Sequence, residues 1–257
     1  MGDETFFNHP YAERQLVVFV DDNKFPNKDT FTWKDAWQYT LKMTDSAFVA
    51  KILVDAIKEL RGRGANILTL PRSRYVDFIL PPGHPRNNLV YAGHPAVAKK
   101  YIPIADFHRL IFEHKFAEAV DLLMCLGAKK IEVEHIAGWG REFSGKLSVG
   151  LQGKSAGGEA GGHGKSQSSI LYSAEFEGRE TPLLPQNMVW FSYESTWQNI
   201  AKGRINFGMK NFSLSLQYNE DYGINASLSS IIQGGGLDAG GKFENHVATT
   251  WQINGTF

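Results

Sequence analysis

The stretch of sequence that decides the fold is residues 141–178, which read REFSGKLSVGLQGKSAGGEAGGHGKSQSSILYSAEFEG. From Phe143 to Gln152 apolar or small residues alternate with polar ones, which predicts a β-strand with one apolar and one polar face. A glycine-rich tip, GGEAGGHG (157–164), follows. A second alternating run then covers Ile170 to Phe176. Two such runs joined by a flexible polar tip predict a long β-hairpin.

A second hairpin is predicted nearer the carboxyl end. Residues 212–218 alternate between apolar and polar side chains, the turn NEDYG follows, and 224–228 is the expected return strand. Residues 205–209 alternate in the opposite phase, so we expect a strand there and a bulge near Lys210 and Asn211. A short polar helix is expected at 195–202, and a last strand at 247–257.

The first half of the chain has a different character. It holds six of the 26 glycines in residues 1–137, against 20 in residues 138–257. Apolar runs predict strands at 16–20, 66–70 and 129–135, and helical spacing predicts helices at 47–61 and 106–126. We therefore expect an α+β fold: a single domain, 1–257, with a helix- and strand-rich part (1–137) and a glycine-rich β-hairpin part (138–257). Its core would be a twisted antiparallel sheet with flanking helices.

Composition and charge narrow the classes of function. The 27 basic and 27 acidic residues leave no net charge, which gives no reason to expect a nucleic-acid partner. The single cysteine, Cys125, cannot form an internal disulfide, which fits a reducing compartment. The acidic start MGDETFF has no apolar signal segment, and no apolar run approaches the roughly 20 residues of a membrane-spanning helix. We expect a chain that is cytoplasmic when soluble.

Motifs for catalysis and metal binding are absent from the sequence. Two GKS tripeptides, at 153–155 and 164–166, lack the glycine that a phosphate-binding loop needs five residues earlier. His108 and His114 are six residues apart, so they do not share a helix face as a metal pair would, and we interpret them as packing or surface residues. We predict no catalytic residues, no metal and no cofactor, although an active site assembled from distant residues would leave no such motif.

Basic residues gather near the end of the first predicted helix and after the next strand. They admit two interpretations: an ordinary solvated surface with ion pairs, or contacts to anionic lipid head groups, where each cation contributes about 1 kcal/mol. The candidate head-group residues are Arg61, Arg63, Arg72, Arg74, Lys99 and Lys100.

The amphipathic strands also admit two interpretations. Alternation is what any half-buried sheet shows, so a soluble α+β binding or interaction protein remains one alternative. The other is a protein that builds a transmembrane β-barrel on assembly, because only helices and closed barrels satisfy every backbone group within a bilayer. Strands of about 12 residues exceed the roughly 9–11 that a tilted spanning strand needs, and the Ser, Gly and Asn faces suit a wet lumen.

The order of elements resembles the pore-forming domain of the gasdermins. The resemblance lies in AFVAKILVDAIKELRGRGANILTLPRS (47–73), in GKLSVGLQGKSAGGEAGG (145–162) with SSILYSAEF (168–176), and in STWQNIAKGR (195–204). It covers about 47–257 and is one of order and pattern. Residues 1–45 and the helix at 106–126 have no clear counterpart, and we expect a short form without a C-terminal repressor domain.

The resemblance implies lipid binding, oligomeric pores and regulated cell death or defence. The implied partners are anionic membrane lipids, further copies or siblings in a large homo- or hetero-oligomer, and a regulatory protein. The chain would move to the membrane when activated. The residues expected to face lipid are Phe143, Leu147, Val149, Leu151, Tyr172, Phe176, Phe212, Leu214, Leu216, Ile224 and Leu228.

Overall fold

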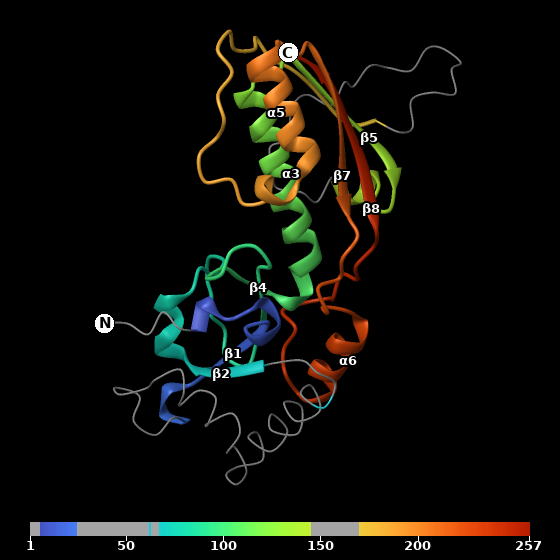
Figure 1. Cartoon of the computed structure of the whole chain (residues 1–257). Coiled ribbons are helices and arrows are strands. Elements are labelled where there is room, and N and C mark those ends of the chain that lie inside the picture. Colours follow the sequence, from blue (N-terminus) through green and yellow to red (C-terminus); the bar gives the residue numbers. More distant parts are fainter. Residues whose placement is uncertain (1–5, 25–61, 63–66, 145–169) are drawn as a thin grey trace, which may run out of the picture. The chain divides into compact units, whose positions relative to one another are not determined.

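The computed structural model describes residues 6–24, 62, 67–144 and 170–257, and these form a mixed α+β fold with two sheets (Figure 1). They divide into two compact units. Unit 1 combines residues up to Leu110 with Asp221–His246, and unit 2 combines Ile111–Glu220 with Val247–Phe257. Each unit is therefore built from separate parts of the chain.

The sheet of unit 1 has the strand order β2-β1-β3-β4. Its strands are β1 (Leu16–Val20), β2 (Ile67–Pro71), β3 (Val90–Gly93) and β4 (Tyr101–Pro103). β1 runs parallel to β2 and antiparallel to β3, and β4 is antiparallel to β3. All five residues of β1, LVVFV, are buried, as expected of a continuous apolar run covered on both faces. The predicted strands 16–20 and 66–70 are thus confirmed.

Short helices surround this sheet. They are the 3₁₀ helices η1 (Phe6–Asn8), η2 (Tyr11–Glu13), η3 (Asp22–Lys24), η5 (Arg72–Asp77) and η6 (Ile104–Asp106), with the α-helix α6 (Ala226–Gly234). Edge-to-face aromatic contacts fill the space beside β1. Phe78 is central, with ring centroids 5.3 Å from Phe19 and 5.0 Å from Tyr101.

Unit 2 holds an entirely antiparallel sheet of order β6-β5-β8-β7. Its strands are β5 (Lys130–Ala137), β6 (Ile170–Glu175), β7 (Asn211–Tyr218) and β8 (Thr249–Thr256). Its helices are α4 (Arg141–Ser144), α5 (Ser195–Phe207) and the 3₁₀ helix η7 (Phe191–Tyr193). The long helix α3 (Phe107–Cys125) begins in unit 1 and continues in unit 2.

The helix predicted at 106–126 is confirmed as α3. It ends because Gly127 takes a φ of +91°, a left-handed conformation that favours glycine, and a Cβ there would lie 2.6 Å from the Arg179 carbonyl oxygen. The helix predicted at 195–202 is also confirmed, and it continues as α5 to Phe207, where Gly208 is a left-handed C-cap. The helix predicted at 47–61 lies outside the described residues.

Three strand predictions in the glycine-rich half are wrong. Residues 205–207 form the last turn of α5 rather than a strand, and Gly208 replaces the expected bulge as the break in the chain. Phe143 lies in the short helix α4, not at the start of a strand. Residues 226–228 open α6, because the Asn225 side chain accepts a hydrogen bond from the Leu228 N–H (3.1 Å) and caps that helix.

The pairing of the hairpins differs accordingly. The partner of β7 is β8, which lies after a long connecting segment, and not the residues 224–228 that follow the NEDYG turn. β6 pairs with β5, whereas most of the expected partner 143–152 lies outside the described residues. The strands predicted at 129–135 and 247–257 are confirmed as β5 and β8.

Candidate functional site

The sheet of unit 2 has one apolar and one polar face. Along β7, Phe212, Leu214 and Leu216 are buried while the residues between them are exposed or half-buried. On the polar face, hydroxyl and amide groups form a ladder: Ser213 Oγ donates to Asn254 Oδ1 (2.7 Å) and accepts from Gln252 Nε2 (2.8 Å). This is the pattern that the sequence predicted for β7, and it makes the sheet amphipathic.

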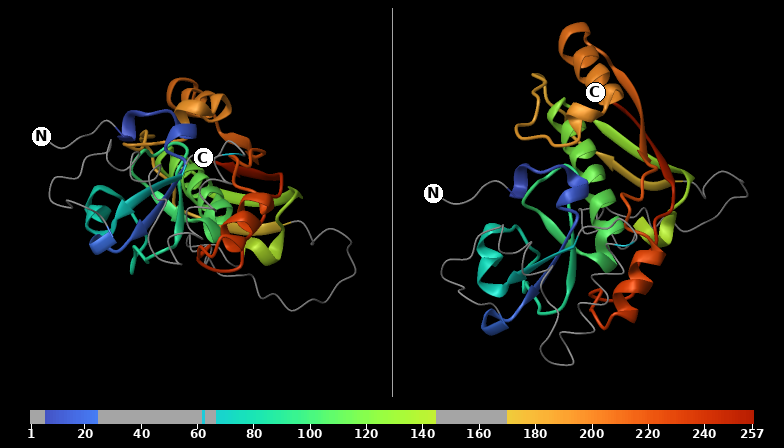
Figure 2. Two further views of the ribbon diagram at one scale, coloured as in Figure 1. Left: turned by 90° about the horizontal axis from the view of Figure 1, so that it is seen from below. Right: turned by 60° about the horizontal axis from the view of Figure 1, so that its bottom comes forward.

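Helix α3 covers the apolar face. The fully buried Trp251 of β8 meets α3 edge to face, with ring centroids 4.7 Å from Phe112 and 5.4 Å from Phe116. The indole Nε1 of Trp251 donates to the Trp139 carbonyl oxygen (2.6 Å). Helix α5 lies beside α3 (Figures 1 and 2), where Arg204 Nε donates to the Leu126 carbonyl oxygen (3.1 Å). The apolar face is therefore closed off in this state.

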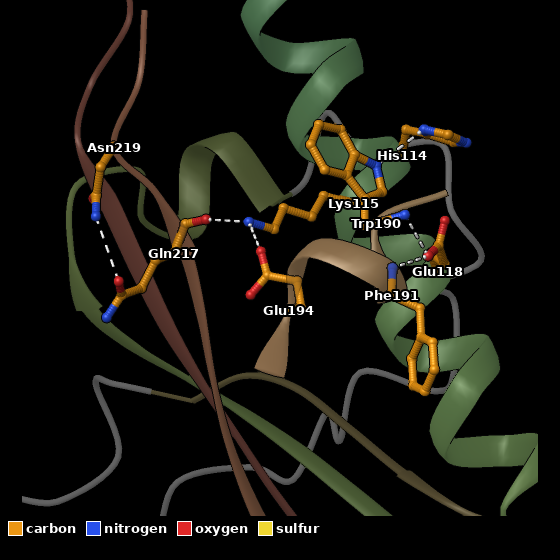
Figure 3. Close-up of polar contacts among 8 residues, drawn as sticks. All are labelled: His114, Lys115, Glu118, Trp190, Phe191, Glu194, Gln217 and Asn219. Carbon is orange, nitrogen blue, oxygen red and sulfur yellow. Dashed lines mark hydrogen bonds and ion pairs between the residues drawn. The ribbon is translucent and has the colours of Figure 1, made fainter. Parts of the chain in front are cut away.

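Glu118 of α3 holds the loop that leads into α5 (Figure 3). Its carboxylate accepts three backbone hydrogen bonds, from the N–H groups of Val189 (2.8 Å), Trp190 (2.7 Å) and Phe191 (2.9 Å). Trp190 Nε1 also donates to His114 Nδ1, one helical turn before Glu118 (3.2 Å). An acceptor-only carboxylate suits consecutive N–H groups, so this contact clips the loop to α3.

Lys115 adds a second connection on the same helix. Its ammonium donates to the Gln217 carbonyl oxygen of β7 (2.9 Å), forms an ion pair with Glu194, and lies 5.4 Å from the centre of the Trp190 ring (Figure 3). Because Lys115 is buried, these partners replace the water it has lost. Lys115 and Glu118 thus tie the sheet, the loop and α3 together.

Substituting Glu118→Gln should lower the free energy of unfolding by about 2 kcal/mol, because an amide oxygen is a weaker acceptor and the amide nitrogen faces N–H donors. Chemical denaturation followed by circular dichroism measures this change. Asp121→Asn, an exposed site on the same helix, is the matched control and should stay within about 0.5 kcal/mol. Equal effects of the two substitutions would contradict the clip.

The sheet contains the strand pairs β5–β6 and β7–β8, and in both pairs the connection between the two strands lies at the same end of the sheet. In the register, Ala137 of β5 pairs near Thr250 of β8, Tyr218 of β7 pairs with Thr249, and Ile170 begins β6 opposite Glu134. The segment 138–169, between β5 and β6, and the segment 219–248, between β7 and β8, therefore both leave from that end.

Most of the segment 219–248, which joins two strands of the unit 2 sheet, belongs to unit 1. Its residues 221–246 are held there by backbone hydrogen bonds. Asp238 N–H donates to the Asn88 carbonyl oxygen and its own carbonyl accepts from Val90 N–H, each at 2.9 Å. Ala105 N–H donates to the Ala239 carbonyl oxygen (2.9 Å). We call residues 221–246 the docked segment.

Side chains add to this docking. Gln15 Nε2 donates to the Tyr222 carbonyl oxygen at 2.6 Å, and Tyr11 packs edge to face on the Tyr222 ring at 6.2 Å. Near the other end, Arg109 lies between Glu244 (3.3 Å) and Asp106 (2.8 Å). The docked segment is thus fixed at its start, middle and end.

The structure separates the predicted lipid-facing residues into groups. Phe212, Leu214 and Leu216 are buried on β7; Tyr172 and Phe176 are half-buried on β6 and directly after it, where burial raises the pKa of Tyr172. Phe143 is buried in α4 with its ring stacked on Trp139 at 4.0 Å. Leu147, Val149 and Leu151 lie outside the described residues. Ile224 and Leu228 are buried in unit 1, Ile224 just before α6 and Leu228 within it, so neither lies on a strand of the unit 2 sheet.

Four of the predicted basic residues, Arg72, Arg74, Lys99 and Lys100, belong to unit 1. Arg72 and Arg74 open η5, where Arg74 pairs with Asp77 at 3.0 Å and Arg72 is exposed. Lys99 is exposed, 5.4 Å above the Phe7 ring, and the Lys100 backbone bridges to Ile79 just after η5. Arg61 and Arg63 lie outside the described residues.

Other kinds of site find little support. Among the residues that the structure describes, no cluster of three or more His, Cys, Asp or Glu side chains is placed to hold a metal ion. Burial raises the pKa of the Cys125 thiol, and Asp121 raises it further, which disfavours a nucleophilic thiolate.

Within the residues that the structure describes, no helix is both long and apolar enough to cross a bilayer. A surface hollow beside the clip is lined by His114, Ala117, Glu118, Asp121, Gln186, Asn187 and Met188.

The comparisons with known proteins identify no relative: no family model, curated protein or solved structure matches this chain.

Proposed function

We propose that this chain perforates membranes by oligomeric assembly and does so without catalysis. The observation that carries the proposal is the topology of unit 2: two antiparallel strand pairs share one amphipathic sheet, and the segments that join each pair leave from the same end. Extending both pairs through these segments would add four strands in one direction. The apolar face would continue toward lipid and the polar face toward a wet lumen.

The joining segments are long enough for this extension. Each has about 30 residues between its two strands, and a tilted spanning strand needs about 9–11, so one segment supplies two strands and a turn. In the first segment, the alternation of Leu147, Val149 and Leu151 with polar residues supplies the face that lipid requires. Backbone pairing along the extended strands would satisfy the hydrogen bonds that a bilayer leaves unmade.

The docked segment fits two secondary structures. Ile224, Leu228, Ile231 and Ile232 recur at helical spacing and are buried in this state. The start of the same stretch, Ile224, Ala226 and Leu228, also alternates with polar residues as a strand would. A segment with both periodicities supports a transition from the docked form to a membrane hairpin.

The surface around η5 supports a first contact with anionic lipid. Tyr75, Val76 and Ile79 are 47%, 70% and 56% exposed, a concentration of apolar side chains next to the exposed cation Arg72. Apolar side chains can enter the interface while each cation near it contributes about 1 kcal/mol. The chain would then be cytoplasmic before activation and membrane-bound afterwards.

Assembly would use the edges of the unit 2 sheet. Among the described strands, β6 and β7 each pair on one side, and an unpaired edge is a template for another strand. Copies, or a sibling protein, joined edge to edge would close a barrel that a single chain cannot close. The cellular outcome would be regulated death or defence, under the control of a regulatory partner.

Dye release from liposomes tests this function. The wild-type chain should release dye from vesicles that contain anionic lipid, and Leu147→Asp should abolish release because a carboxylate on the lipid face is costly. Ser148→Asp, on the opposite face, is the matched control and should retain release. Leu214→Asp is a poor test, since Leu214 is fully buried and its loss would unfold unit 2. Vesicles that stay sealed at every lipid composition would overturn the proposal.

One observation favours a second function, a non-enzymatic binding protein. Tyr193 and Phe207 of unit 2 are 75% and 77% exposed, and large exposed aromatic side chains are enriched at protein interfaces. Under this alternative the vesicles remain intact and Tyr193→Ser with Phe207→Ser removes saturable binding of a protein partner.

A further inference from the structure

A buried histidine joins the docked segment to α3 within unit 1. His108 is fully buried, and its Nε2 lies 2.5 Å from the Ile224 carbonyl oxygen. A carbonyl only accepts, so Nε2 carries the proton and donates it, and the neutral imidazole satisfies this contact. His246, from the far end of the docked segment, packs on His108 with ring centroids 5.3 Å apart, and Phe243 packs at 6.2 Å. One side chain thus touches both ends of the segment.

Aromatic rings pack on His108, and titratable groups lie nearby on the docked segment and on α3. From the start of the docked segment, the acidic group is Asp221, with Tyr222 packed on the neighbouring Phe107. From the end of the segment come His246 and Glu244. From α3 and the turn before it come Arg109 and Asp106, and Arg109 pairs with two carboxylates, those of Asp106 and Glu244. Of these groups, Asp221 favours a positive charge on His108, whereas burial and His246 oppose it.

We propose that His108 and His246 form an acid-sensitive latch, which holds the docked segment on unit 1 at neutral pH and releases it on acidification. Protonation would place a positive charge on a fully buried ring that packs against His246 and Phe243, and burial disfavours the charged form. Because His108 contacts Ile224 at the start of the segment and His246 at its end, its protonation weakens the hold on both ends together.

The direction and size of the effect follow from linkage. Burial lowers the pKa of His108 from its usual 6.5 to about 4; the Ile224 carbonyl raises it, the charge of His246 lowers it, and Asp221 raises it. The docked state thus favours the neutral ring, so docking is stable above pH 6.5 and weakens progressively as the pH falls from 6.5 toward 4. Between pH 7.5 and pH 5 the released population should rise about 30-fold.

Hydrogen exchange of the soluble protein, without lipid, tests the latch. After correction for intrinsic exchange rates, amides of α6 should lose about 30-fold of their protection between pH 7.5 and pH 5. Amides of β7 and β8 should not follow, because they belong to unit 2. Protection in α6 that is equal at the two pH values would overturn the proposal.

Substitution of the latch residue separates its role from general acid sensitivity. His108→Gln retains an N–H donor for the Ile224 carbonyl but does not titrate, so the pH dependence of α6 protection should vanish. His9→Gln, at an exposed histidine, should leave that dependence unchanged. An unchanged dependence in His108→Gln would overturn the latch. An NMR titration of the wild-type imidazole needs no variant: His108 should titrate near pH 4, and titration near 6.5 would overturn it.

The consequence for membranes rests on the proposed function. Dye release at pH 5 should exceed release at pH 7.5, and His108→Gln should equalise the two. Loss of α6 protection in acid without any leakage would retain the latch and overturn the pore. Leakage together with pH-independent α6 protection would retain the pore and overturn the latch.

Discussion

The double substitution Ala105→Cys with Gly241→Cys should abolish dye release from anionic liposomes until a reductant is added. A Cβ at position 241 would lie 3.8 Å from the Ala105 Cβ, which is the mean Cβ separation of a disulfide. The bond would tether the docked segment to unit 1, and a tethered segment cannot extend into a membrane hairpin. Leakage of the oxidised protein compared with the reduced protein measures the effect on one and the same preparation.

The controls isolate the tether. Cys125→Ser removes the native thiol and prevents mispairing. The single variant Gly241→Cys measures the cost of a side chain at a φ of +149°, about 1–3 kcal/mol, and Ala105→Cys measures the packing change. Both singles should leak with or without oxidant. If the oxidised double variant leaks as fast as its reduced form, membrane insertion does not require release of the docked segment.

Substituting Trp251→Ala should lower the free energy of unfolding by about 3–5 kcal/mol, the usual cost of truncating a buried tryptophan. The side chain is fully buried between β8 and α3, and its indole nitrogen satisfies the Trp139 carbonyl oxygen. Truncation would leave a cavity beneath the apolar face and an unsatisfied carbonyl. Urea denaturation followed by circular dichroism provides the measurement.

Two substitutions calibrate that loss. Trp251→Phe retains much of the ring packing but loses the hydrogen bond, so its effect should be the smaller of the two. Tyr193→Ala removes an aromatic side chain that is 75% exposed, and should change stability by no more than about 0.5 kcal/mol. A loss below 1 kcal/mol for Trp251→Ala would mean that α3 does not depend on this contact to cover the sheet.

Local patterns in the sequence predicted the elements that depend on local interactions. The run Leu16–Val20, the helix that ends at Gly127 and the alternation of β7 each follow from neighbours within a few residues. The strand prediction at 224–228 was wrong because five residues are too few to distinguish the two-residue period of a strand from the 3.6-residue period of a helix. The helix is favoured because Asn225 caps it and because the next apolar residues, Ile231 and Ile232, continue the helical spacing.

The contacts that build the candidate site are long-range, and the sequence did not reveal them. The pairing of β7 with β8 spans the whole docked segment, so it depends on where unit 1 places that segment. Glu118 binds backbone N–H groups, which every residue type offers, and no motif marks such a partner. The contact of His108 with Ile224 likewise uses a carbonyl more than a hundred residues away.

The chain passes between its two units at three points, after Leu110, after Glu220 and after His246. Neither unit is therefore encoded by one continuous stretch, and no single truncation yields either of them whole. Gene rearrangements that duplicate or transfer domains act on continuous stretches, so these units cannot be exchanged separately in the way that domains joined by a linker can. Because of this connectivity, we expect the two units to have been inherited together.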